Sequence, residues 1–95
     1  IVAGPGALFT VSNGHEIMAH VVGTGCMAAS VIGTFAGAAP DRAAAAAAAG
    51  LACYEIAAEL AAESCGGPGT FKELLFDRIY HLKESEVASR QRVRQ

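Results

Sequence analysis

The sequence predicts an α/β fold in which a short β-hairpin and strands are followed by three helices. β-prone residues separated by glycine turns fill residues 1–22. Apolar residues then recur at helical spacing in three later segments, and glycine or proline separates these segments. A length of 95 residues allows one domain or a part of one, so residues 1–95 are expected to be a segment of a single domain.

Three extended segments are expected near the start of the chain. Ile1–Ala3 precedes the turn signal Gly4-Pro5-Gly6, so it is expected to end a strand that begins in an absent upstream part. Residues 8–11 form a β-prone run that leads to Asn13-Gly14, a dipeptide suited to the positive φ angles of a tight turn. This order predicts a hairpin into a further strand over residues 17–22.

The first helix is expected to start near Gly25 or Cys26, directly after a glycine turn. Apolar residues then recur at helical spacing as far as Gly37, and Ala39-Pro40-Asp41 interrupts the pattern.

Two further helices are expected over residues 41–63 and 70–83. The first of these is rich in alanine, the residue with the highest helix propensity. At the start of the second, Thr70 and Glu73 have the T-x-x-E spacing of a capping box, which predicts Thr70 as the N-cap.

Small residues dominate the composition. The chain holds 21 Ala and 11 Gly, while 53% of its residues are hydrophobic and 17% are charged. It is therefore too apolar and too weakly charged for a disordered segment. Because alanine and glycine supply little core volume, we expect the chain to bury part of its surface against a partner.

Charge and cysteine content exclude several classes. The net charge is −2, and the basic residues near the C-terminus have no interleaved aromatics, so nucleic-acid binding is not expected. Residues 84–95 are expected to be an exposed tail. Cys26, Cys53 and Cys65 have no metal-like spacing, so neither a disulfide framework nor a metal site is indicated. A reducing cytoplasm fits this cysteine usage.

One segment is long enough to span a bilayer. Val21–Pro40 carries no charge, but glycines interrupt it and most of its residues are small, so no membrane contact is expected. Gly33 and Gly37 have the G-x-x-x-G spacing, which in a folded domain lets two elements approach closely.

Three acidic residues share one face of the second helix. Glu55, Glu59 and Glu63 are four residues apart, and like charges at this spacing repel weakly. Two interpretations remain, a solvated face and an acidic site, and the solvated face is the expectation.

The segment best suited to binding is the junction of residues 21–27, where a β-prone run passes through Gly23-Thr24-Gly25 into a helix. Such a junction directs free backbone N–H groups and the positive end of the helix at one point, which suits a phosphate oxygen. The junction lacks the Lys and Ser/Thr of a P-loop and the three-glycine spacing of a dinucleotide fold.

Five motifs together carry a family resemblance. They are Asn13-Gly14-His15, Ile17-Met18, Gly23-Thr24-Gly25-Cys26-Met27, residues 54–59 of the alanine-rich helix, and Gly67-Pro68-Gly69-Thr70-Phe71. In this order they resemble the hydroxyethylthiazole kinases, from Ile1 to about Leu82. The resemblance covers the C-terminal third or so of such an enzyme.

The resemblance implies the C-terminal part of a ribokinase-like α/β fold and a transferase activity. The reaction would be ATP-dependent phosphorylation of the primary alcohol of 4-methyl-5-(2-hydroxyethyl)thiazole, in thiamine biosynthesis or salvage, with Mg²⁺ on the nucleotide. It also implies a cytoplasmic homo-oligomer, a trimer, that includes the missing N-terminal part of the same protein.

The resemblance further implies roles for four residues. Gly23 would contact the thiazole substrate, and the backbone from Gly23 through Thr24 and Gly25 to Cys26 would form the anion hole. Cys26 has two interpretations. Helix N-termini stabilise thiolates, so it could act as the base on the alcohol; or it is a small packing residue beneath the anion hole.

Two alternatives stay open. A hydroxymethylpyrimidine (phosphate) kinase shares the glycine-cysteine junction. A non-catalytic anion-binding or assembly module would use the alanine-rich helices to join subunits and the junction only as a turn.

Overall fold

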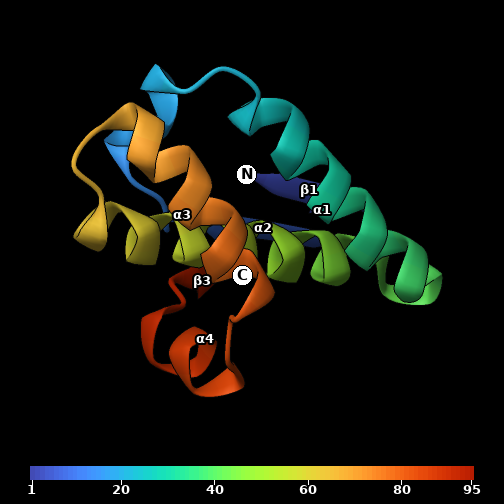
Figure 1. Ribbon diagram of the computed structural model, residues 1–95. Coiled ribbons are helices and arrows are strands. Elements are labelled where there is room, and N and C mark those ends of the chain that lie inside the picture. The colour runs from blue at the N-terminus through green and yellow to red at the C-terminus, as the bar shows by residue number, and fades with distance from the viewer.

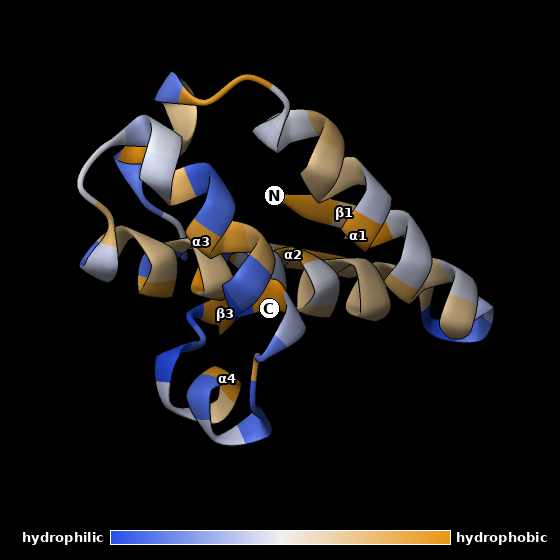
Figure 2. Ribbon diagram, in the orientation of Figure 1, coloured by the Kyte–Doolittle hydropathy of each residue, from blue (hydrophilic) through white to orange (hydrophobic).

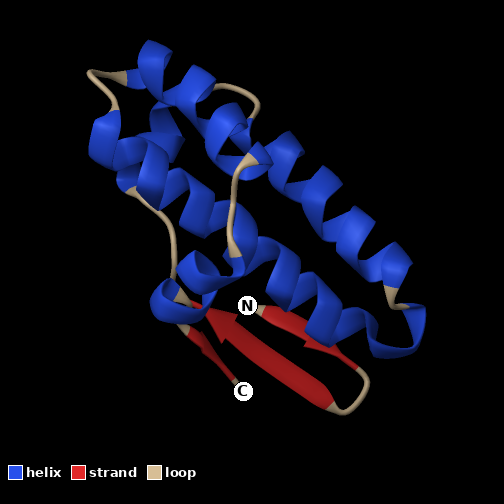
Figure 3. Ribbon diagram, turned by 60° about the horizontal axis from the view of Figure 1, so that its bottom comes forward, coloured by secondary structure: helices blue, strands red, loops and turns tan.

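The computed structural model describes residues 1–95 and places a small sheet against one side of a layer of helices (Figures 1 and 3). This confirms the α/β class and the three predicted helices. In chain order the elements are β1 (Val2–Gly4), β2 (Ala7–Val11), the 3₁₀-helix η1 (Glu16–His20), α1 (Thr24–Ala38), the 3₁₀-helix η2 (Pro40–Arg42), α2 (Ala43–Ser64), α3 (Pro68–Tyr80), α4 (Glu84–Arg90) and β3 (Val93–Arg94).

The sheet is antiparallel and has the order β1-β2-β3. Gly4 pairs with Ala7, so the hairpin turn consists of Pro5 and Gly6, and Gly6 has a φ of 73° that suits glycine. The predicted hairpin at Asn13-Gly14 is therefore wrong, because the hairpin turn lies at Pro5-Gly6.

The strand predicted over residues 17–22 is also wrong, because residues 16–20 form η1. Ile17, Met18 and Val21 pack against the core cluster with a spacing that a turn of helix provides and a strand does not. The two edges of β2 are already occupied by β1 and β3, so the sheet offers this segment no place beside β2.

Helix α2 is the centre of the fold and contacts α1, α3 and the hairpin. Its alanines Ala57, Ala58 and Ala61 are fully buried, and with Tyr54 they pack against two large side chains of α3, Phe71 and Leu75. Small residues set the helix spacing: a Cβ at Gly50 would lie 2.9 Å from Cγ of Phe35 in α1. The alanine-rich composition therefore serves close packing of α1 on α2.

Helix α3 starts at Pro68, two residues before the predicted N-cap Thr70. Proline suits the first turn of a helix because its missing N–H has no partner there anyway, and Gly67 precedes it in an extended conformation. Thr70 lies inside the helix, so the capping box at Thr70 and Glu73 is wrong. The helix ends at Tyr80 rather than at residue 83.

Residues 84–95, expected to be an exposed tail, form α4 and β3. All of their side chains are exposed or half-buried, and Val93 and Arg94 pair with β2. In Figure 1 this red segment folds back beneath α2.

Only one face of the sheet carries helices (Figure 3). The alternating burial along β2 leaves Leu8 56% exposed on the other face. One helical stretch, Pro40–Ser64, is long and apolar enough to cross a membrane by length and composition, and its buried side is the core of this fold.

Candidate functional site: an open helix N-terminus

The glycine junction places the start of α1 at the surface. Gly23 is the N-cap with a left-handed φ of 98°, and its carbonyl accepts the first helical hydrogen bond, from Met27 N–H at 2.9 Å. The amides of Thr24, Gly25 and Cys26 therefore have no partner within the helix. These three N–H groups point along the axis at the positive end of a 15-residue helix, an arrangement that favours an anion.

The space in front of this helix end is open. A Cβ built at Gly25 would meet nothing within 4 Å, and its φ is in the ordinary range. Cys26 is exposed as well. The positive φ at Gly23 therefore requires glycine. At Gly25 the backbone does not require glycine, but the absence of a side chain leaves the helix end open to a ligand.

Both the side chain and the carbonyl of Thr24 are hydrogen-bonded within the chain. Its hydroxyl lies 3.0 Å from the carbonyl oxygen of Met18 and 3.1 Å from that of Val21, and shares its proton between them. Its own carbonyl accepts a hydrogen bond of 2.8 Å from the hydroxyl of Tyr54 in α2. The side chain of Thr24 therefore serves the loop, and only its backbone amide is available to a ligand.

His15 and Cys65 form hydrogen bonds only with groups close to them in the sequence. His15 accepts a hydrogen bond from Ile17 N–H through Nδ1 at 3.1 Å and so caps η1. Burial raises the pKa of the Cys53 thiol, which keeps it protonated. Cys65 lies 3.5 Å from the Ala62 carbonyl at the end of α2.

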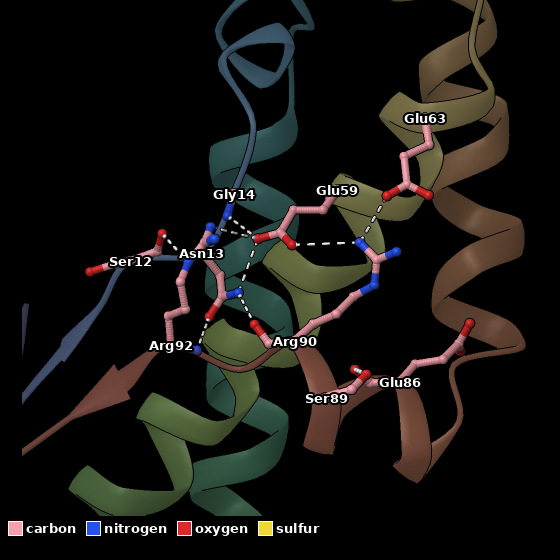
Figure 4. A network of polar contacts seen from close by, with 9 residues as sticks. All are labelled: Ser12, Asn13, Gly14, Glu59, Glu63, Glu86, Ser89, Arg90 and Arg92. Atoms are coloured by element: carbon pink, nitrogen blue, oxygen red, sulfur yellow. Dashed lines mark hydrogen bonds and ion pairs between the residues drawn. The ribbon is translucent and has the colours of Figure 1, made fainter.

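The acidic face of α2 is a structural cluster rather than the expected solvated face (Figure 4). The Glu59 side chain is only 14% exposed, and its Oε2 accepts from Asn13 Nδ2 at 3.0 Å and from Gly14 N–H at 2.8 Å. Arg92 approaches the same oxygen at 3.3 Å, and Arg90 pairs with Glu63 at 2.9 Å. Sequence spacing could not show this, because the two arginines lie in the segment expected to be a tail.

Glu55 is the one member of this face without an arginine. Its pKa is raised, mainly by burial and also by the neighbouring charge of Glu59. A Cβ at Gly14 would come within 3.1 Å of Glu55 Oε2, so the loop lies directly against this carboxyl.

The chain brings together no three His, Cys, Asp or Glu side chains that could hold a metal ion. The donors around the junction are backbone amides, which suit an anion and not a cation. A surface groove with a volume of about 490 Å³ lies at the other end of α1, beside Phe35 and Ala38.

A short antiparallel hairpin beneath a helical layer, with a glycine junction opening the first long helix, defines the chain as the C-terminal part of a ribokinase-like α/β domain. The family model of the hydroxyethylthiazole kinase family matches residues 1–85. The chain belongs to this family.

Individual relatives agree with the family match. A hydroxyethylthiazole kinase of Methanosarcina mazei is 48% identical over 85 residues, which cover 90% of this chain and 32% of the relative. One from Desulforudis audaxviator is 46% identical over 93 residues, which cover 98% of this chain and 34% of the relative. The solved structure of the hydroxyethylthiazole kinase protein from Pyrococcus horikoshii OT3 matches with a TM-score of 0.85 and 37% identity, over 90% of this chain and 33% of that chain. The chain thus spans about a third of the length of the relatives it matches.

Proposed function

We propose that the complete polypeptide carrying this chain phosphorylates the primary alcohol of 4-methyl-5-(2-hydroxyethyl)thiazole with ATP, in thiamine biosynthesis or salvage. The observation that carries the proposal is the open N-terminus of α1. Its three free amides, at Thr24, Gly25 and Cys26, lie in a chain that belongs to the hydroxyethylthiazole kinase family.

Phosphoryl transfer depends on positioning and charge stabilisation, which amides at a helix start supply. In the proposed reaction the alcohol oxygen forms a bond to the γ-phosphorus, the bond from that phosphorus to the bridging oxygen of ATP breaks, and ADP leaves. We assign the three amides to the charge that develops on the transferring phosphoryl group, and Gly23 to contact with the thiazole. The alcohol proton goes to a base, a role for which the exposed thiol of Cys26, as thiolate, is our candidate.

Mg²⁺ bound to the nucleotide would offset the charge of the ATP phosphates. Because this chain gathers no metal-binding cluster, we assign the contacts to the nucleotide and its metal to the remaining part of the protein.

We also propose that the working enzyme is a cytoplasmic homotrimer that includes the N-terminal part of the same protein. Two surfaces support a need for further protein: the bare face of the sheet around Leu8, and α1, which has no buried residue and no charged one. Figure 2 shows α1 free of strongly hydrophilic residues along its whole length. Light scattering on the complete protein tests the trimer, and a monomer at working concentration would contradict it.

The activity is tested with the purified complete polypeptide and radiolabelled ATP. We expect label in the phosphate ester of hydroxyethylthiazole and much less with hydroxymethylpyrimidine as the acceptor. Turnover of the pyrimidine alone, or of neither alcohol, would overturn the proposal.

A further inference from the structure

Tyr54 is a buried tyrosine whose hydroxyl has one partner. The residue is 2% exposed in the middle of α2, and its ring belongs to the core cluster with Phe71 and Leu75. A phenylalanine would fill this space equally well, so packing alone does not explain the hydroxyl. Burial raises the pKa of Tyr54, helped by the charge of Glu55, and the group therefore remains a hydrogen-bond donor at neutral pH.

The acceptor of this hydrogen bond is the Thr24 carbonyl, 2.8 Å away in the first turn of α1. That carbonyl and the Gly25 N–H belong to the same planar trans peptide group, in which the two point in opposite directions. Fixing the carbonyl therefore fixes the direction of one of the three free amides. A hydrogen bond to the carbonyl also polarises the peptide group and makes its N–H a stronger donor.

No other side-chain hydrogen bond joins α1 to α2. The rest of their contact consists of small and apolar side chains, such as Phe35 against Gly50, and such contacts are non-directional. The Tyr54 hydroxyl is thus the one side-chain hydrogen bond from α2 to the start of α1, whose Thr24 hydroxyl is bonded only to the loop before it.

We infer that Tyr54 is a positioning residue of the phosphate site: through the Thr24 carbonyl it orients and polarises the Gly25 amide. This inference rests on the proposed function. Tyr54 acts on the reacting atoms only through this peptide group, because its ring and hydroxyl are buried.

The test compares Tyr54→Phe with Tyr80→Phe in the complete polypeptide. The chain has two tyrosines, and Tyr80 is 83% exposed, which makes it a matched control. For Tyr54→Phe we expect kcat to fall by about 10-fold, with the KM for the thiazole alcohol nearly unchanged, because a slightly misdirected donor weakens transition-state contacts. Tyr80→Phe should match the wild type in both constants. Assays are run well below each variant's Tm, so that a loss of stability alone leaves kcat unchanged.

A second readout follows the Gly25 amide by NMR in protein labelled with ¹⁵N-glycine. With inorganic phosphate as the probe, the Gly25 resonance should shift in the wild type and in Tyr80→Phe, and shift less in Tyr54→Phe.

The outcomes separate the two claims. If the wild type is active and Tyr54→Phe keeps its full kcat, the inference is refuted and the proposed function stands. A Tyr54→Phe protein that fails to fold also refutes it, since the hydroxyl would then be a folding requirement. If the wild type phosphorylates neither alcohol, the proposed function fails and the inference fails with it.

Discussion

Asn13 and Glu59 are 46 positions apart in the chain, and their side chains meet in a hydrogen bond of 3.0 Å. The Asn13 amide makes two further hydrogen bonds. The same Nδ2 also donates to the Arg90 carbonyl, and Oδ1 accepts from Arg92 N–H, both at 2.8 Å. A single buried amide therefore joins the loop after β2, the middle of α2 and the C-terminal segment. Asn13-Gly14, whose sequence predicts a hairpin turn, instead fastens this loop to Glu59 of α2.

The first prediction concerns this contact. Glu59→Ala should destabilise the complete protein by about 2–4 kcal/mol, because it leaves Asn13 Nδ2, the Gly14 amide and Arg92 without their shared acceptor. The measurement is the urea unfolding midpoint.

Glu63→Ala is the matched control on the same face of α2. Its side chain is 56% exposed and pairs with Arg90 alone, so the loss should be about 1 kcal/mol or less. Equal losses for the two variants would show that the loop is not held by Glu59.

The helices could be predicted from the sequence because their signals are local. Apolar spacing places the first helix within two residues of α1, and alanine propensity does the same for α2. The predicted start of α3 is wrong because two local signals compete there. Pro68 at the first helical position prevails over the capping box at Thr70.

The errors in the sheet and the site have a different cause. Residues 17–22 are β-prone, but whether they form a strand depends on a free sheet edge, and β3 occupies that edge from the far end of the chain. The arginine partners of Glu59 and Glu63 also come from that segment, so no local pattern reveals them. The start of the helix at the glycine junction can be predicted because the turn at Gly23 and the first helical hydrogen bond involve only neighbouring residues, whereas the contact with Tyr54 cannot.

The second prediction is a pH dependence at Glu55. Its pKa is raised in the folded state, so protonation favours folding. This contribution is fully present below the unfolded pKa and is lost as the pH rises through the folded pKa. At pH 7 the ionised carboxyl therefore opposes folding, and Glu55→Gln should raise the Tm there. The gain should disappear in acid, below the unfolded pKa of about 4.3. A Tm difference that is the same at both pH values would contradict this.

The third prediction separates backbone conformation from ligand approach. Gly23→Ala should lower stability by about 1–2 kcal/mol, because its φ of 98° is unfavourable for a residue with a Cβ. Gly25→Val should leave the Tm and the helicity intact, since the new side chain enters open space, and should remove the kinase activity by blocking the phosphate.

Gly66→Val is the control for the second of these variants. Gly66 also has open space around it, and it lies in the α2–α3 connection away from the junction, so both activity and Tm should be retained. Normal turnover of hydroxyethylthiazole by Gly25→Val would reject the assignment of the phosphate site.

The fourth prediction is that residues 1–95 expressed alone are inactive and do not unfold cooperatively. Only 12 of the 95 residues are buried, and none of these lies in α1 or α4. Calorimetry and the kinase assay check this, with the complete polypeptide as the control. A cooperative thermal transition together with kinase activity from the isolated chain would refute it.

The last prediction concerns Cys26, for which the sequence leaves two roles open. Cys26 is exposed at the start of α1, so its thiol is open to reagents. Iodoacetamide should therefore modify Cys26 faster than Cys53, whose pKa is raised by burial, and ATP with the thiazole alcohol should slow the modification.

If the Cys26 thiolate is the base, Cys26→Ser should lower kcat by about 100-fold or more. Cys65→Ser should have little effect on kcat, because Cys65 lies at the far end of α2 and packs on the core cluster rather than at the junction. The pH profile decides the role. A rate that rises with pH through one ionisation in the wild type and becomes flat in Cys26→Ser supports the base. Unchanged profiles in the two proteins would leave the backbone amides of the helix start as the only catalytic groups of this chain.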